Sequence, residues 1–372
     1  MTAKQQSAID RRHMRHALAL AERGLGTVWP NPAVGCVVVA DDGEILGRGW
    51  TRPGGRPHAE TVALEQAGKR TQGATAYVTL EPCAHHGRTP PCAEALVKAG
   101  VRRAVIAADD PDPRVAGRGY DILAAAGIEV VRDVCAEAAH DVNAGFLTGV
   151  TAGRPMVTLK LATSLDGRIA TAAGESKWIT GPEARRAGHR LRASHDAILV
   201  GIGTALADDP SLTCRLAGLQ DRSPVRVVLD SRGRLDKQSA LVTTARDVPV
   251  WVITSEAGHD RSRLLKEQGV DVQVVSTDVK GRPDPLAVLK VLQGRGITRL
   301  LVEGGAEVAR SFLSVGLVDR IAWFRAPGVI GGDGLAAIGP LGIEALGETP
   351  RFSLQKVRRV GQDLLETYKS AR

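Results

Sequence analysis

Short apolar segments alternate with helical patterns twice along the chain, and this alternation restricts the fold more than any other feature of the sequence. Strands that alternate with helices form layered α/β domains, in which helices cover a sheet. The 372 residues are enough for two or three such domains. In the first series the expected strands are residues 34–40, 45–50, 76–80, 101–107 and 127–132, and the expected helices begin near residues 8, 58 and 92.

The second series begins after residues 151–155, which have the Gly and Pro content of a linker. No internal repeat relates the two series. We therefore expect two unlike α/β domains, residues 1–147 and residues 148–372. In the second series the expected strands are residues 156–162, 197–201, 225–230, 250–254, 270–275, 300–303 and 320–326, with helices between them, for instance residues 182–192.

Composition argues against several classes of protein. Five cysteines are too few, and odd in number, for a disulfide framework, and the first residues lack the apolar core of a signal peptide, so we expect a cytoplasmic protein. No apolar run reaches the roughly 18–20 residues of a membrane span. Aromatic residues make up only 3% of the chain, which argues against nucleic-acid binding by base stacking. We expect neither a membrane nor nucleic acid as a partner.

The net charge of +8 lies entirely in the second series. Residues 1–150 contain 17 Lys and Arg and 17 Asp and Glu, so residues 151–372 carry the whole excess. A basic half is compatible with nucleic acid or with small phosphorylated ligands. The basic residues are scattered, without a block of five or six like charges, and this does not indicate a nucleic-acid-binding arm.

Residue types with zinc-binding chemistry follow one another in the first series, as His58-Ala-Glu60, Pro82-Cys83 and Pro91-Cys92. One imidazole and two thiolates supply three ligands, and three protein ligands with an open fourth position are typical of catalytic rather than structural zinc. Both cysteines lie near expected helix N-termini, where the helix dipole favours the thiolate. Each residue alone could be an ordinary core residue, but this order favours a zinc site with one Zn²⁺ per chain.

Glu60 follows His58 by two residues, on the first turn of an expected helix. At that spacing the carboxylate can reach a water molecule at the open position without itself binding the metal. A carboxylate placed in this way is suited to proton transfer toward a leaving amine. Glu60 is therefore the expected catalytic residue.

The zinc-deaminase signature is H-x-E followed by P-C-x-x-C, but here eight residues separate Cys83 from Cys92. The segment EPCAHHGRTPPCAEAL, with PNPAVG before it and DPDPRVAGRG after it, resembles the pyrimidine deaminase of riboflavin biosynthesis. The resemblance implies a cytidine-deaminase-like α/β/α domain and a substrate contact at Asn31. The family usually has Asn where this chain has Asp112.

The longer loop between the two cysteines adds three candidates for contact with the base or the ribose phosphate. These are His85, His86 and Arg88. For His86 a solvated loop histidine is an equally good interpretation.

The second series resembles the reductase of riboflavin biosynthesis, whose fold is like that of dihydrofolate reductase. The matching segments are LKLATSLDGRIA, GESKWITG, LADDPSLT, LDS and VEGG, in this order. With the first half they cover nearly the whole chain in the order of the fused deaminase–reductase family. The resemblance implies NADPH as a cofactor and a phosphorylated pyrimidine as substrate, which is deaminated at its 2-amino group and then reduced from the ribosyl to the ribityl form.

The same resemblance implies site residues in the second half. From the residues alone, the glycine pair that follows strand 300–303 suits phosphate binding by backbone N–H groups, and an arginine suits a bidentate phosphate contact. A plain turn and solvated arginines are the simpler alternatives. The implied cofactor contacts are Ala162, Trp178, Thr204, Asp208, Ser231, Gly305, Ala306, Glu307, Val308, Ala309, Arg310 and Ser311, and the implied substrate contacts are Lys160, Ser176, Arg192, Leu212, Arg215 and Glu303.

Two other functions stay open at this point. A nucleoside or tRNA deaminase with a basic accessory domain is one, although the long loop between the cysteines, the neutral first half and the few aromatic residues argue against it. A non-catalytic regulator that has kept a zinc fold is the other, although it would have no need of Glu60. We also expect a homo-oligomer, a dimer or a tetramer.

Overall fold

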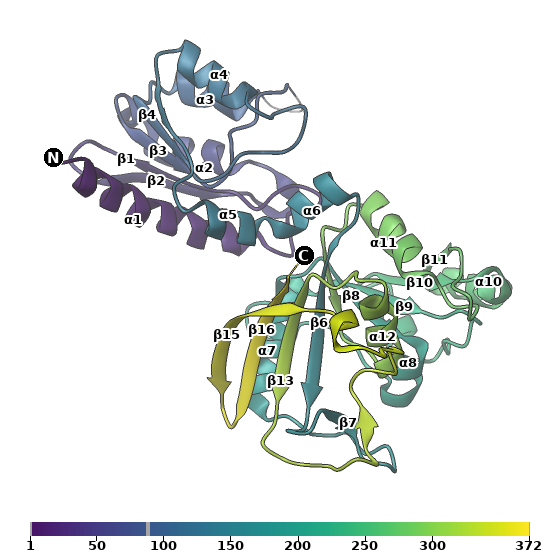
Figure 1. Cartoon of the computed structure of the whole chain (residues 1–372). Helices are drawn as coiled ribbons and strands as arrows, with labels where there is room; N and C mark the ends of the chain where they lie inside the picture. Colours follow the sequence, from purple (N-terminus) through teal and green to yellow (C-terminus); the bar gives the residue numbers. More distant parts are fainter. Residues whose placement is uncertain (1, 87–89, 372) are drawn as a thin grey trace. The chain divides into compact units, whose positions relative to one another are not determined.

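A computed structural model describes residues 2–86 and 90–371 and divides the chain into two compact units, residues 1–154 and 155–372 (Figure 1). The boundary expected between residues 147 and 148 falls inside helix α6 (Ala144–Ala152), which belongs to unit 1. Within the described ranges, no helix combines the length and the apolar character needed to cross a membrane.

Unit 1 is built on a five-stranded sheet in the order β2-β1-β3-β4-β5. Strand β1 is antiparallel to β2 and β3, and β3, β4 and β5 are parallel to one another. The strands are β1 (Gly35–Val39), β2 (Ile45–Trp50), β3 (Thr75–Val78), β4 (Arg103–Ile106) and β5 (Glu129–Val131), and the helices besides α6 are α1 (Ala3–Ala21), α2 (Ala59–Ala67), α3 (Cys92–Lys98), α4 (Arg118–Ala125) and α5 (Ala136–Val142).

Two glycines let helices approach this sheet closely. A Cβ atom on Gly35 would lie 1.9 Å from the carbonyl oxygen of Ala17 in α1, and one on Gly49 would lie 2.0 Å from the carbonyl oxygen of Ala59 in α2. Gly49 pairs with Cys36, the neighbour of Gly35, so α1 and α2 lie on opposite faces of the sheet. Every residue of β1 is consequently buried between helices, and the first residues of α2 are held against the sheet.

Unit 2 contains a nine-stranded sheet in the order β11-β10-β9-β8-β12-β6-β13-β16-β15. The strands from β11 to β13 are parallel, and β13, β16 and β15 form an antiparallel edge. The bounds are β6 (Met156–Thr163), β8 (Ala197–Gly201), β9 (Val225–Leu229), β10 (Val250–Thr254), β11 (Asp271–Val274), β12 (Arg299–Val302), β13 (Arg320–Arg325), β15 (Phe352–Val360) and β16 (Asp363–Ser370), with β7 (Arg168–Ala170) and β14 (Leu335–Ala336) in a separate pair.

Helices follow the parallel strands of unit 2. Helix α8 begins directly after β8, and three residues separate the end of β12 from the start of α12, so both helix starts lie beyond the carboxyl ends of adjacent strands. Free backbone N–H groups at such helix starts are suited to bind anions. The helices are α7 (Pro182–Ala193), α8 (Ile202–Asp208), α9 (Ala240–Thr243), α10 (Glu256–Arg263), α11 (Pro285–Gly294) and α12 (Ala306–Ser314).

The close approach of α2 to β2 gives a first prediction. Substitution of Gly49 by Ala places a Cβ atom against helix backbone, which must move, so we expect about 1–3 kcal/mol lower stability of unit 1 and weaker metal retention. Thermal unfolding and metal analysis measure both effects. Gly188→Ala is the control, because a Cβ there meets nothing within 4 Å and helix α7 gains a better helix former. Unchanged unfolding of Gly49→Ala would contradict this account of the packing.

Candidate active sites

Three potential zinc ligands come together in unit 1. The ligand atoms of His58, Cys83 and Cys92 all lie within 4.8 Å of one another. His58 Nδ1 is 3.3 Å from Cys92 Sγ and 3.7 Å from Cys83 Sγ, close to the separation of about 3.5 Å between two ligands of a tetrahedral zinc ion. The three side chains therefore fit a zinc ion with one position left open.

Local structure explains how these side chains meet. His58 is the N-cap residue of α2, Cys92 is the first residue of α3, and Cys83 lies in the loop after β3. Cys83 is thus not at the start of a helix, but its Sγ accepts the backbone N–H of Cys92 at 3.3 Å, so the start of α3 still supports it. The hydrogen bonds from Cys92 and His58 lower the pKa of the Cys83 thiol to about 4, which favours the thiolate that zinc requires.

Glu60 lies next to the three ligands, on the first turn of α2, and only 3% of it is exposed. Burial, followed by the charge of Cys83, raises the pKa of Glu60 to about 7. A carboxyl group with a pKa near the working pH can both accept and return a proton. The geometry therefore suits the catalytic role expected from the sequence, which stays a prediction.

A cavity, which we call the His58 pocket, opens beside these residues. Asn31 lies in its wall on the segment 30–34, which is fixed because Asn143 Oδ1 accepts the N–H of Ala33 at 2.9 Å. Another part of the wall is held by Glu81. The lining consists of Pro30, Asn31, Pro32, Val34, Thr51, Arg56, His58, Glu60, Leu80, Glu81, Cys83, His85, Asp110, Asp112, Arg114, Val115 and Phe146.

Glu81 explains why residues 110–115, which follow β4, lie in this wall. Its carboxylate is buried and accepts the backbone N–H groups of Gly117 at 3.1 Å and Gly119 at 2.9 Å. Burial raises the pKa of Glu81, and these backbone bonds oppose the rise. Sequence reasoning had assigned Glu81 no role, although its position directly before Pro82-Cys83 was a usable signal.

The three residues expected to contact the substrate from the loop between Cys83 and Cys92 do not all line the His58 pocket. His85 lines the His58 pocket, and its Nδ1 is buried without a hydrogen-bond partner in the described part of the chain. His86 points elsewhere, with Nε2 3.1 Å from Glu94 and most of its side chain exposed, which agrees with the solvated interpretation. Arg88 lies outside the described residues.

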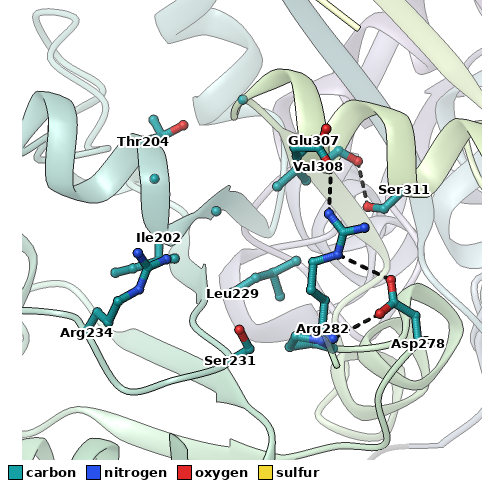
Figure 2. Close-up of a pocket in the computed structure, with 14 residues that line it drawn as sticks. Ile202, Thr204, Leu229, Ser231, Arg234, Asp278, Arg282, Glu307, Val308 and Ser311 are labelled. Atoms are coloured by element: carbon teal, nitrogen blue, oxygen red, sulfur yellow. Dashed lines mark hydrogen bonds and ion pairs between the residues drawn. The ribbon is translucent and has the colours of Figure 1, made fainter. Parts of the chain in front are cut away.

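A second cavity, the Gly305 pocket, lies in unit 2 beyond the ends of β8, β9 and β12. Gly305 precedes α12 with φ of 58°, a conformation that favours glycine. Figure 2 shows Arg282 reaching both Asp278 and Glu307, on the side of the pocket opposite Arg234. The lining consists of Gly201, Ile202, Gly203, Thr204, Leu229, Ser231, Arg234, Asp278, Arg282, Pro283, Gly305, Glu307, Val308 and Ser311.

Half of the expected cofactor residues lie in this lining, namely Thr204, Ser231, Gly305, Glu307, Val308 and Ser311. The other half do not line it. Ala162 is on β6, Trp178 is 68% exposed beneath the guanidinium of Arg185, and Asp208 pairs with Lys177 at 3.7 Å. In α12, Ala306 lies on the first turn, Ala309 is buried, and Arg310 pairs with Glu307 at 3.2 Å.

Sequence reasoning missed the residues that close the Gly305 pocket from other segments. Gly201 and Gly203 form a glycine-containing junction between β8 and α8, which resembles the Gly304-Gly305 junction before α12 and could have been recognised. Arg234 follows Ser231 by three residues and was a second usable signal. Asp278 and Arg282 come from a loop that no motif marked.

Several expected substrate residues form a buried charged cluster. Arg192 donates two hydrogen bonds to the Glu303 carboxylate, at 2.8 and 3.0 Å, and Lys160 Nζ lies 3.6 Å from the same group. Burial alone would raise the pKa of Glu303, but Arg192 and Lys160 hold it at about 2. Because Nε and Nη2 of Arg192 donate to Glu303 and its Nη1 donates to the Thr213 carbonyl at 3.1 Å, Arg192 is poorly placed for the phosphate role suggested by its residue type, and that role stays a prediction.

The remaining expected substrate residues lie on neighbouring loops. Leu212 is buried, with φ of 52°, and Arg215 is exposed with Nη1 2.5 Å from Ser211 Oγ. Ser176 is half-buried in the segment between β7 and α7. Of the two expected phosphate contacts, Arg192 and Arg215, it is therefore Arg215 whose side chain is more available to a ligand.

Comparisons with known proteins match both units. Residues 7–108 match the family described as the cytidine and deoxycytidylate deaminase zinc-binding region, and residues 155–365 match the RibD C-terminal domain. The chain is 43% identical to the riboflavin biosynthesis protein RibD of Aquifex aeolicus, over 97% of this chain and 98% of that protein. It is 42% identical to RibD of Escherichia coli, over 95% and 98%.

Comparison with solved structures points to the same family of proteins. RibD of Acinetobacter baumannii is 42% identical and superposes with a TM-score of 0.87, over 98% of this chain and 100% of that one. A diaminohydroxyphosphoribosylaminopyrimidine deaminase/5-amino-6-(5-phosphoribosylamino)uracil reductase from Thermotoga maritima is 36% identical with a TM-score of 0.87, over 98% and 100%.

Fold and sites thus define a two-domain enzyme, a zinc-type deaminase joined to a reductase, and the expected fold classes are confirmed. The chain belongs to the RibD family, the bifunctional deaminases and reductases of riboflavin biosynthesis. This finding supports the riboflavin interpretation over a nucleoside or tRNA deaminase with an accessory domain.

The ligand geometry gives a second prediction, that each chain binds one zinc ion through His58, Cys83 and Cys92. The Cys83→Ala/Cys92→Ala double variant should lose the metal, because one imidazole alone cannot hold it. Elemental analysis of the purified protein measures this. Cys135→Ala is the matched control in the same unit, since Cys135 lies outside the cluster. A zinc-free native protein, or a zinc-loaded double variant, would disprove the assignment.

Proposed function

We propose that unit 1 hydrolytically deaminates 2,5-diamino-6-(5-phosphoribosylamino)pyrimidin-4(3H)-one, with loss of the 2-amino group as ammonia. The observation that carries this proposal is the cluster of His58, Cys83 and Cys92 beside the buried Glu60, at a pocket that His58, Glu60 and Cys83 line. The name of the Thermotoga maritima relative, a diaminohydroxyphosphoribosylaminopyrimidine deaminase, supports the choice of substrate.

In this proposal a zinc ion, when bound, supplies a Lewis acid that lowers the pKa of water to about 7. The protein supplies orientation and proton transfer. Glu60 accepts a proton from the attacking water and returns a proton to the departing amine, a task suited to a pKa near 7. Asn31, in the wall of the same pocket, contacts the substrate.

Unit 2, in the same proposal, reduces the ribosyl chain of the deaminated product to ribityl, with NADPH as hydride donor. The Gly305 pocket receives the cofactor, since it combines the start of α12 with two arginines, Arg234 and Arg282. The protein's task is to align donor and acceptor, because the cofactor brings the hydride. Lys160, Arg215 and Glu303 contact the substrate.

Three broader proposals accompany this function. The deaminase corresponds to unit 1 and the reductase to unit 2, as the two family matches support. A reducing cytoplasm suits a chain whose five cysteines are all free thiols. Assembly into a dimer or tetramer is kept as a proposal that sedimentation or light scattering can test.

If the deaminase site of unit 1 and the reductase site of unit 2 work independently, a third prediction follows. Glu60→Gln preserves shape and removes the base, so zinc should stay bound while ammonia release falls by roughly 10²–10⁴-fold. The same protein should oxidise NADPH at the native rate when it is given pre-deaminated substrate. Near-native deamination would exclude Glu60 as the proton carrier. Loss of both activities in a folded, zinc-loaded variant would exclude independent sites.

The separation of cofactor and substrate in unit 2 gives a fourth prediction. Arg215→Ala should weaken substrate binding by roughly 10–150-fold, the value of one charge-assisted hydrogen bond, and spare NADPH. Gly305→Val should do the reverse, because a branched side chain at φ of 58° is strained and blocks approach to the backbone. The measurement is the dissociation constant of the substrate and that of NADPH, determined separately for each variant. If Arg215→Ala weakens NADPH and spares the substrate, the two subsites are assigned in the wrong order.

A further inference from the structure

The His58 pocket contains two carboxylates whose oxygens are already used by the backbone. Glu81 accepts the N–H groups of Gly117 and Gly119, and Asp110 accepts the N–H of Asp112 at 2.9 Å. Arg56, in the same lining, already interacts within the chain. A phosphorylated substrate brings negative charge into this acidic pocket, so it needs a cation with unused hydrogen-bond donors.

Arg114 is held in the wall of the pocket by one edge of its guanidinium group. Its Nε lies 3.0 and 3.1 Å from the two carboxylate oxygens of Asp112, and its Nη2 donates to Asp112 Oδ2 at 2.5 Å. Asp112 Oδ1 also accepts the backbone N–H of Arg114 at 2.9 Å. These contacts lower the pKa of Asp112, so the pair is ionised at neutral pH.

The other edge of the guanidinium group is available. Within the described residues, Arg114 Nη1 has no hydrogen-bond acceptor, and the side chain is 70% exposed, whereas that of Asp112 is 13% exposed. A guanidinium group has five N–H donors, so two remain on Nη1 and one on Nη2. A planar pair of donors matches two oxygens of a phosphate group.

We propose that Arg114 binds the 5′-phosphate of the pyrimidine in the deaminase site and that Asp112 fixes Arg114 for this contact. The inference rests on the proposed function of unit 1. It also gives a role to the carboxylate of Asp112, which holds one edge of the guanidinium group. An amide oxygen can keep the turn bond to the N–H of Arg114, but an amide cannot pair with the guanidinium group as a carboxylate does.

The alternative is that Arg114 only neutralises Asp112, and a double variant separates the two. Deamination kinetics are measured for the native enzyme, D112N, R114Q and D112N/R114Q, on the phosphorylated substrate and on the same riboside without phosphate. We expect R114Q and D112N/R114Q each to raise KM for the phosphorylated substrate by roughly 10–150-fold, with kcat and the KM of the riboside nearly unchanged. D112N should raise the KM for the phosphorylated substrate less than R114Q does, because Arg114 is still present.

Further measurements keep the result interpretable. Zinc content and thermal unfolding verify that each variant is folded, and R114K, which keeps the charge without the planar fork, should lie between native and R114Q. Ribose 5-phosphate should inhibit the native deaminase competitively and inhibit R114Q more weakly. R102Q is the matched control, since Arg102 forms an exposed pair with Asp41 outside the pocket lining, and its KM should be unchanged.

Three outcomes would overturn the proposal. Native KM in D112N/R114Q would show that Arg114 only neutralises Asp112. An equal rise of KM for both compounds in R114Q would show a role unrelated to phosphate, and native KM in R114Q would show no role in binding. A native enzyme that releases no ammonia from the phosphorylated substrate would instead contradict the proposed function itself, so the two failures are distinguishable.

Discussion

The chemistry of both units depends on one constraint, that parallel strands end at the same edge of a sheet and helices begin there. In unit 1, Cys83 follows β3 and Asp110 follows β4, while α3 begins at Cys92. In unit 2, Glu303 and Gly305 follow β12, directly beside the end of β8. Helix starts bring free N–H groups to this edge, and open strand ends leave room for a ligand. Both pockets are consequently built from loops that a rigid sheet holds in place.

The buried glutamates of the two sites, Glu303 in unit 2 and Glu60 in unit 1, are stabilised in different ways. In unit 2 the Glu303 carboxylate is compensated by two cations, Arg192 and Lys160, so it stays ionised inside the protein. Removal of either cation would leave a buried charge incompletely paired, which is costly. In unit 1, burial and the charge of Cys83 raise the pKa of the Glu60 carboxyl group to about 7, and the charge of His58 opposes this rise only in part. The first arrangement fixes a charge for binding, and the second leaves a proton free to move.

The sequence predicted the zinc cluster more completely than the Gly305 pocket, for a physical reason. His58, Glu60, Cys83 and Cys92 lie in one short stretch with recognisable residue types. The Gly305 pocket instead joins four distant segments, and the Arg192–Glu303 pair spans 111 residues, so no local pattern reveals them. Strands β15 and β16 were also missed; nearly all of β15 is exposed, including its apolar Leu354 and Val357, so it has no buried face that would impose a regular apolar pattern.

The distribution of charge along the chain requires each unit to attract a phosphorylated ligand in its own way. Residues 1–150 have no net charge, so a general field cannot draw a phosphate to the His58 pocket, and the attraction must come from a group in direct contact. Arg114 offers such a contact because Asp112 occupies only one edge of its guanidinium group. Residues 151–372, nearly all of them in unit 2, carry the whole excess of +8, so unit 2 can combine long-range attraction with local contacts. A substrate that visits both sites with its phosphate in place would thus meet Arg114, held by Asp112, in the first site and the excess of basic residues of the second half of the chain in the other.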